Sequence, residues 1–148
     1  MDLGALYQEI ILEHNRSPRN HGELPDATGH AHGKNPMCGD EVSVWVRTAG
    51  DRVERVTFTG HGCAISRASA SMMTQALTGK TRDEALALFQ HFHDMVTGAG
   101  PADEAALGKL KVFGGVSRFP ARVKCASLAW HAFRDALAGG DHDGDPAS

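Results

Sequence analysis

The stretch EVSVWVRTAGDRVERVTFTGHGC, residues 41–63, decides the fold of this 148-residue chain. Apolar and polar residues alternate on both sides of an Ala-Gly-Asp turn at 49–51, which is the pattern of two half-buried strands in a hairpin. From Cys63 onward the apolar residues recur every three or four positions, as far as Gly79. The sequence therefore predicts a β-hairpin that leads directly into a helix beginning at Cys63.

Three further helices are indicated outside this stretch. Apolar residues at helical spacing mark the first, over 3–14. Thr81 and Glu84 have the spacing of a capping box, and the helix that they open is predicted to end at Gly98. Pro120, a favourable residue for a first helical turn, opens the last predicted helix.

The remaining segments carry weaker patterns. Residues 15–40 are rich in Pro, Gly, Asn and His, so we expect a long loop with a short edge strand near 27–33. Residues 102–119 predict no defined element. The tail, GGDHDGDPAS, is too polar to pack, and we expect one domain over 1–140 followed by a disordered segment over 141–148.

Composition excludes several classes of function. The chain is 41% hydrophobic with a net charge of -3, and no run of Lys and Arg is dense enough to follow a nucleic-acid backbone. No stretch approaches the roughly 20 apolar residues of a membrane span, and the N-terminus does not resemble a secretion signal. We therefore expect a cytoplasmic protein that binds neither nucleic acid nor membrane. Its three cysteines are then free thiols or metal ligands, because disulfides are rare in that compartment.

The three cysteines have different local settings. Cys38 lies in the loop segment NPMCGDEV beside Asp40, Cys63 opens a helix, and Cys125 lies inside the last helix. Each cysteine can be a structural core residue or a functional thiol. Taken singly, Cys125 is best explained as a core residue, and the two roles are evenly balanced for Cys63. The position of Cys38 in a polar turn favours a functional thiol. Their spacing matches no zinc knuckle, but if all three converge, three thiolates and Asp40 supply the four ligands that tetrahedral Zn²⁺ takes.

Four motifs in this order carry a family resemblance: LYQEIILEHNRSPRNHG, NPMCGDEV, GHGCAIS and RVKCASLAW. They resemble the NifU/IscU-type iron-sulfur assembly family, and specifically its SufU branch, over nearly the whole chain. The resemblance implies an α+β fold, with a small antiparallel sheet of about three strands packed against several helices. It also implies one metal site formed by Cys38, Asp40, Cys63 and Cys125.

Two features favour the SufU branch over the IscU-type scaffolds. The position before Cys125 holds Lys124, where those scaffolds carry a histidine, and a charged ammonium cannot serve as a ligand. The interval between Cys63 and Cys125 also resembles the longer interval of SufU relatives. The resemblance thus implies a zinc-dependent sulfurtransferase with one Zn²⁺ per chain. It would take persulfide sulfur from a PLP-dependent, SufS-type cysteine desulfurase and pass it to the downstream iron-sulfur assembly machinery.

Two other functions stay open at this point. One is a scaffold on which an iron-sulfur cluster is assembled, and the other is a structural zinc module that binds a partner without chemistry. We expect Cys38 to carry the transferred sulfur, because it alone lies in a loop flanked by Gly and Pro. Arg122 precedes Cys125 by three residues, so it shares a helix face with it and is either a cation for the negative site, a desulfurase contact or a solvated surface residue. His61 is kept as a neighbour of the site.

Overall fold

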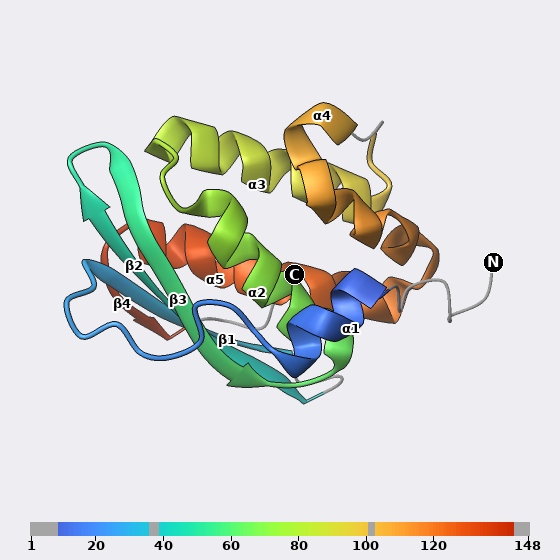
Figure 1. Cartoon of the computed structure of the whole chain (residues 1–148), viewed down its shortest axis with the longest axis horizontal. Helices are drawn as coiled ribbons and strands as arrows, with labels where there is room; N and C mark the ends of the chain where they lie inside the picture. Colours follow the sequence, from blue (N-terminus) through green and yellow to red (C-terminus); the bar gives the residue numbers. More distant parts are fainter. Residues whose placement is uncertain (1–8, 36–38, 101–102, 144–148) are drawn as a thin grey trace.

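The computed structural model describes residues 9–35, 39–100 and 103–143, and Figure 1 shows how the elements are arranged. In chain order these are α1 (Glu9–Arg16), β1 (Gly29–Asn35), β2 (Asp40–Ala49), β3 (Arg52–His61), α2 (Ala64–Leu77), α3 (Arg82–Thr97), α4 (Glu104–Leu107), the 3₁₀ helix η2 (Gly108–Arg118), α5 (Pro120–Leu137) and β4 (Gly140–Asp143). The predicted α+β class is confirmed.

The sheet has the strand order β3-β2-β1-β4. The predicted hairpin is confirmed as β2 and β3, which pair antiparallel, and β1 adds a third antiparallel strand on the other side of β2. The fourth strand corrects the predicted tail: residues 140–143 pair in parallel with the start of β1, so the disorder predicted from residue 141 is wrong for this strand. Residues 144–148 lie outside the described ranges.

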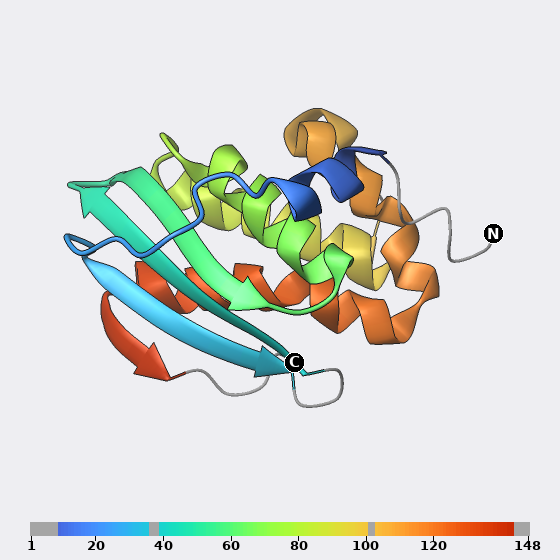
Figure 2. The same ribbon diagram turned by 60° about the horizontal axis from the view of Figure 1, so that its bottom comes forward.

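The helices lie on one side of the sheet (Figure 2). The face that they cover carries the inward-pointing valines of β2, Val42, Val44 and Val46, which are at most 3% exposed. α5 packs along β1 and β2, and α2 packs on β3 and on α5. α3 and η2 pack on each other and on α5, and α1 packs on α2. This layering gathers the apolar side chains into one core and brings the start of α2 near the first turns of α5.

Local sequence signals account for the helix boundaries. Cys63 is the N-cap residue of α2, as predicted. Thr81 and Glu84 form the complete capping box at the start of α3, and Gly98 ends that helix in a left-handed conformation with φ of 73°. Pro120 lies in the first turn of α5, where its missing N–H costs no hydrogen bond.

Residues 102–119, for which no element was predicted, form α4 and η2 in their described part. The buried apolar residues of this segment recur at every third position. They are Leu107, Leu110, Phe113 and Val116, and each is at most 3% exposed. A spacing of three places side chains on one face of a 3₁₀ helix, whose turn contains three residues. The sequence left this segment undefined because a spacing of three does not match the 3.6-residue period of an α-helix.

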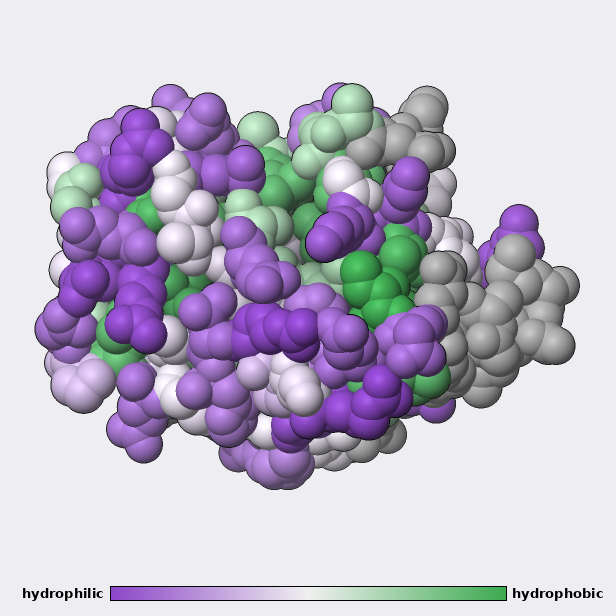
Figure 3. Space-filling view, in the orientation of Figure 1, coloured by the Kyte–Doolittle hydropathy of each residue, from purple (hydrophilic) through white to green (hydrophobic). Residues whose placement is uncertain are grey.

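The surface in Figure 3 is largely hydrophilic, and hydrophobic colour is confined to separate patches between polar groups. No helix in the described ranges is long and apolar enough to cross a membrane.

Candidate metal centre

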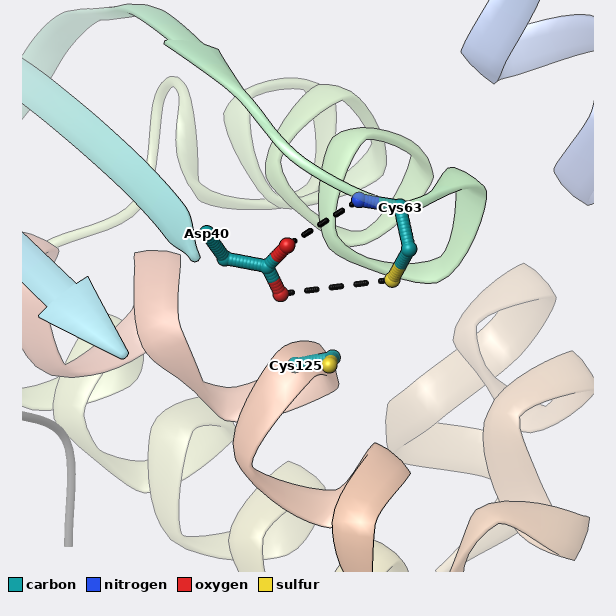
Figure 4. Close-up of side chains that lie close together, drawn as sticks. All are labelled: Asp40, Cys63 and Cys125. Carbon is teal, nitrogen blue, oxygen red and sulfur yellow. Dashed lines mark hydrogen bonds between the residues drawn. The ribbon is translucent and has the colours of Figure 1, made fainter. Parts of the chain in front are cut away.

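Three of the four predicted ligands meet at one end of the sheet (Figure 4). One donor atom each of Asp40, Cys63 and Cys125 lies within 4.8 Å of the other two. The three residues come from the start of β2, the N-cap of α2 and the second turn of α5. Among the residues that the structure describes, this is the only group of three or more such side chains close enough to share an ion.

Asp40 is held in a fixed orientation. It pairs with Asn35 at the end of the β1–β2 ladder where the chain passes from one strand to the other, and it is only 1% exposed. Its Oδ1 accepts a hydrogen bond of 3.0 Å from the backbone N–H of Cys63, and its Oδ2 lies 4.0 Å from the Cys63 sulfur. One carboxylate oxygen is therefore occupied by the backbone, and the other faces the thiols.

Gly62 makes this approach possible. A Cβ atom at this position would lie 2.3 Å from Asp40 Oδ1 and 2.7 Å from its Cγ, and the residue has φ of 156°, which L-residues rarely adopt. Only glycine fits between β3 and α2 without displacing the carboxylate. Gly62 was not among the predicted site residues, although the Gly-His-Gly run at 60–62 is a pattern that indicates a close backbone approach.

The surroundings of Cys63 favour its thiolate form. Its pKa falls from 9.0 to about 6, chiefly because its sulfur accepts a hydrogen bond from Cys125 and also because the backbone N–H groups of Ser66 and Ile65 point at it. Burial and the nearby Asp40 carboxylate act in the opposite direction on this pKa. The free N–H groups of the first turn of α2 thus stabilise negative charge on the sulfur, as helix N-termini do.

Cys125 combines both explanations that the sequence left open. It is 1% exposed and belongs to the hydrophobic core, yet its sulfur lies beside Cys63 and Asp40. The sulfur also lies 3.5 Å from the carbonyl oxygen of Ala121, one turn earlier in α5. A buried cysteine on a helix stripe is thus part of the cluster, which spacing in the sequence could not reveal.

The other predicted site residues have different outcomes. Cys38 lies outside the described residues. Arg122 is half-buried in the first turn of α5, and Lys124 is exposed. His61 does not join the three donors; its Nε2 lies 2.9 Å from Glu41 Oε2, on the residue that follows Asp40.

The donors present suit a soft or borderline metal ion. Two thiols and a carboxylate match ligands that Zn²⁺ accepts, and both sulfurs are also suitable for iron in a cluster. Burial of Asp40 and Cys125 gives the site a low dielectric, in which like-charged donors are costly unless a cation offsets them. The geometry and the donor chemistry therefore fit a bound metal.

Comparison with known proteins gives the site a family context. Residues 6–126 match the family described as NifU-like N terminal domain. The chain belongs to this family. This NifU-like domain is 44% identical to the Bacillus subtilis protein named zinc-dependent sulfurtransferase SufU, over 93% of the chain and 92% of the relative. It is 42% identical to the Streptococcus pyogenes protein named iron-sulfur cluster assembly scaffold protein IscU, over 91% of the chain and 84% of the relative.

The fold agrees with this assignment. The NifU-like domain superposes on the crystal structure of FiSufU from Fervidobacterium islandicum with a TM-score of 0.86 and 38% identity, covering 92% of this chain and 99% of the other. The predicted membership of the IscU/SufU family and the predicted fold class are both confirmed. The relatives carry two different functional names, so the family alone does not choose between sulfur transfer and cluster assembly.

Proposed function

We propose that this protein is a zinc-dependent sulfurtransferase that accepts persulfide sulfur from a cysteine desulfurase and relays it to iron-sulfur cluster assembly. The observation that carries the proposal is the convergence of Asp40, Cys63 and Cys125 within 4.8 Å. The 44% identity to a Bacillus subtilis protein with this name supports it. Free thiols and the need to share a compartment with the sulfur donor are consistent with a cytoplasmic location.

Cys38 is proposed as the fourth ligand. It is separated from Asp40 by a single residue, so covalent geometry alone keeps the two Cα atoms within about 7 Å of each other. Three thiolates and one carboxylate would complete the tetrahedral set for one Zn²⁺ per chain. Bound zinc would keep the sulfurs deprotonated at neutral pH without any redox chemistry of its own.

In the proposed transfer, the thiolate of Cys38 attacks the terminal sulfur of a persulfide on the desulfurase. A new S–S bond forms on Cys38 while the S–S bond of the donor breaks, and the donor cysteine leaves as a thiolate that can take up a proton. No electron is gained or lost overall, so no further reductant is needed. Cys38 suits this role because Cys63 and Cys125 are committed to helices α2 and α5.

Lys124 is the feature that favours zinc over a cluster. It directly precedes Cys125 and is exposed, and an ammonium group has no lone pair to offer a metal while it is charged. The alternative function, a scaffold on which an iron-sulfur cluster is assembled, is favoured by the scaffold name of the 42% identical relative. Colourless protein with one zinc per chain would support sulfur transfer or a structural zinc module, and cluster absorbance after anaerobic reconstitution would support the scaffold.

The desulfurase is proposed to dock on the predicted first helix, residues 3–14, which the structure describes from Glu9 onward, together with the segment 36–40 and Arg122. Arg122 shares a helix face with Cys125, so its guanidinium is suited to offset the negative charge of the site or to contact the partner. Arg122→Ala should lower the maximal stimulation of a SufS-type desulfurase while zinc content stays at the wild-type level. Unchanged stimulation across a concentration series would remove Arg122 from the docking face.

The experiment that tests the function is desulfurase turnover with and without this protein, with metal analysis of the same sample. A sulfurtransferase should raise turnover of cysteine to alanine, and the increase should vanish when the protein is stripped of zinc. Zinc-loaded protein that binds the desulfurase without raising its turnover would instead be a structural zinc module. The matched control is Glu54→Gln. Glu54 lies near the start of β3, at the end of the strand that is far from Cys63, so this change should leave stimulation of the desulfurase unchanged.

A further inference from the structure

A cluster of two imidazoles and a carboxylate, side chains of types that can bind metals, lies on the opposite face of the sheet from the centre described above. Glu41 follows Asp40 in β2, and because successive strand residues point to opposite faces, Glu41 points away from the helices. Glu41 is the register partner of His61 on β3, and His32 on β1 is its diagonal neighbour. Together with His21, these side chains line a hollow of about 420 Å³.

The imidazoles already face the carboxylate of Glu41. His61 Nε2 lies 2.9 Å from Oε2, and His32 Nε2 lies 3.3 Å from Oε1. The other ring nitrogen of His32, Nδ1, lies 2.8 Å from the hydroxyl oxygen of Ser43, which fixes the ring with Nε2 toward Glu41. A hydrogen bond to the second ring nitrogen is what orients most metal-binding histidines.

We propose that His32, Glu41 and His61 form a second, exchangeable site for a divalent transition-metal ion such as Zn²⁺ or Ni²⁺. Two donors that each bind one ion at about 2.1 Å are about 3.0–3.4 Å apart, depending on the angle at the metal. The two nitrogen–oxygen separations found here lie close to that range. Imidazole with carboxylate is a donor set that suits zinc, copper and nickel.

The site is more open than the thiol centre. The donor atoms of His32, Glu41 and His61 do not all lie within 4.8 Å of one another, so one ion can collect both imidazoles only if a side chain rotates. His61 is the side chain that can rotate, because it is 70% exposed and borders the hollow. The same exposure makes the bound ion accessible to solvent, so we expect weaker binding and faster exchange than at the buried centre.

A cation already competes for this position. Lys34 Nζ lies 3.8 Å from Glu41 Oε1, and the lysine side chain is 61% exposed. A metal ion must displace this ammonium from the carboxylate, which lowers its affinity. Removing the lysine charge while keeping its apolar stem, as in Lys34→Met, should therefore tighten metal binding.

The test uses untagged protein loaded with zinc at the thiol centre, dialysed to equilibrium against micromolar Ni²⁺ at constant neutral pH. Elemental analysis should find one nickel beyond the resident zinc in the wild type. His61→Ala and Glu41→Gln each remove a proposed ligand, so they should weaken nickel binding by at least the roughly 10- to 100-fold that loss of a ligand's orienting partner costs, whereas Lys34→Met should strengthen it. The matched control is His30→Ala, on the same strand face as His32 but stacked on Trp45, which should bind nickel normally.

Two results would overturn the proposal. One is the absence of nickel binding by the wild type, and the other is equal binding by all variants, which would assign the ion to other histidines. Zinc content should stay constant throughout, and no thiolate-to-nickel absorbance should appear. If a variant also loses zinc, histidine ¹⁵N spectra of the wild type with excess zinc decide: Nε2 of His32 and His61 must shift selectively, and unchanged signals would refute the site.

Discussion

Replacement of Gly62 by alanine tests whether close packing at Asp40 controls the metal centre. The added Cβ would lie 2.3 Å from Asp40 Oδ1, so the carboxylate must retreat by about 1 Å to restore an ordinary contact. That movement breaks the 3.0 Å hydrogen bond from the Cys63 backbone to a charged acceptor, at a cost of about 1.5–3 kcal/mol. The unfavourable backbone conformation adds about 1–3 kcal/mol.

We therefore expect Gly62→Ala to lower the free energy of unfolding by about 2.5–6 kcal/mol. Zinc affinity should also fall by about 10- to 100-fold, because a ligand oxygen must be placed to within about 0.2 Å. Urea unfolding of the metal-free protein measures the first effect, and competition with a chromogenic chelator measures the second.

Gly79→Ala is the matched control. Gly79 also has a positive φ, of 88°, but no atom lies within 4 Å of the position of an added Cβ. It should be destabilised by backbone strain alone and should retain wild-type zinc affinity. If Gly62→Ala binds zinc as tightly as Gly79→Ala, close packing of Gly62 against Asp40 does not position the carboxylate for the metal.

Three more predictions concern metal, thiol and proton. Elemental analysis should show that Cys63→Ser and Cys125→Ser each lose zinc, and full zinc occupancy in either variant would contradict the shared site. The metal-free wild type should keep its helical circular dichroism but should unfold at a lower urea concentration. In metal-free protein, the pH dependence of Cys63 alkylation should follow a pKa near 6. Cys125→Ala should raise this pKa, because it removes the hydrogen bond that chiefly lowers the pKa, and an unchanged pH dependence would be evidence against that hydrogen bond. Burial lowers the pKa of His14 below 6.5, so its contribution to stability is present above pH 6.5 and is lost as the pH falls through the lowered value. His14→Gln should accordingly reduce the loss of urea resistance between neutral and acidic pH in metal-free protein, and an identical loss in both proteins would be evidence against this role.

Prediction from sequence succeeded where a local pattern has one structural solution. The alternation around residues 49–51 specifies a hairpin, and the capping box at Thr81 specifies the start of α3. The prediction was incomplete where pairing depends on distant residues. The strand of residues 140–143 gains its backbone partners only when α5 returns the chain to β1, so its polar composition gave no sign of it.

The candidate metal centre shows the same difference between residues that local sequence identifies and residues that only long-range packing brings together. Cys63 could be recognised as a helix N-cap from its neighbours, because the change in apolar spacing occurs at that residue. The proximity of Cys125 is a property of how α5 packs on α2, and spacing along the chain does not encode it. Only the family resemblance linked these residues in advance. The Gly-His-Gly run at 60–62 indicates a close backbone approach, but it does not specify that Asp40 is the side chain approached.

The most direct test of the proposed function is to locate the sulfur that the protein accepts. The zinc-loaded protein is incubated with a cysteine desulfurase and cysteine, then digested and mapped by mass spectrometry under non-reducing conditions. We predict that the mass of one added sulfur appears on the peptide containing Cys38, and that Cys38→Ala neither carries the sulfur nor stimulates the desulfurase. Sulfur found mainly on Cys63 or Cys125, or full stimulation by Cys38→Ala, would contradict it.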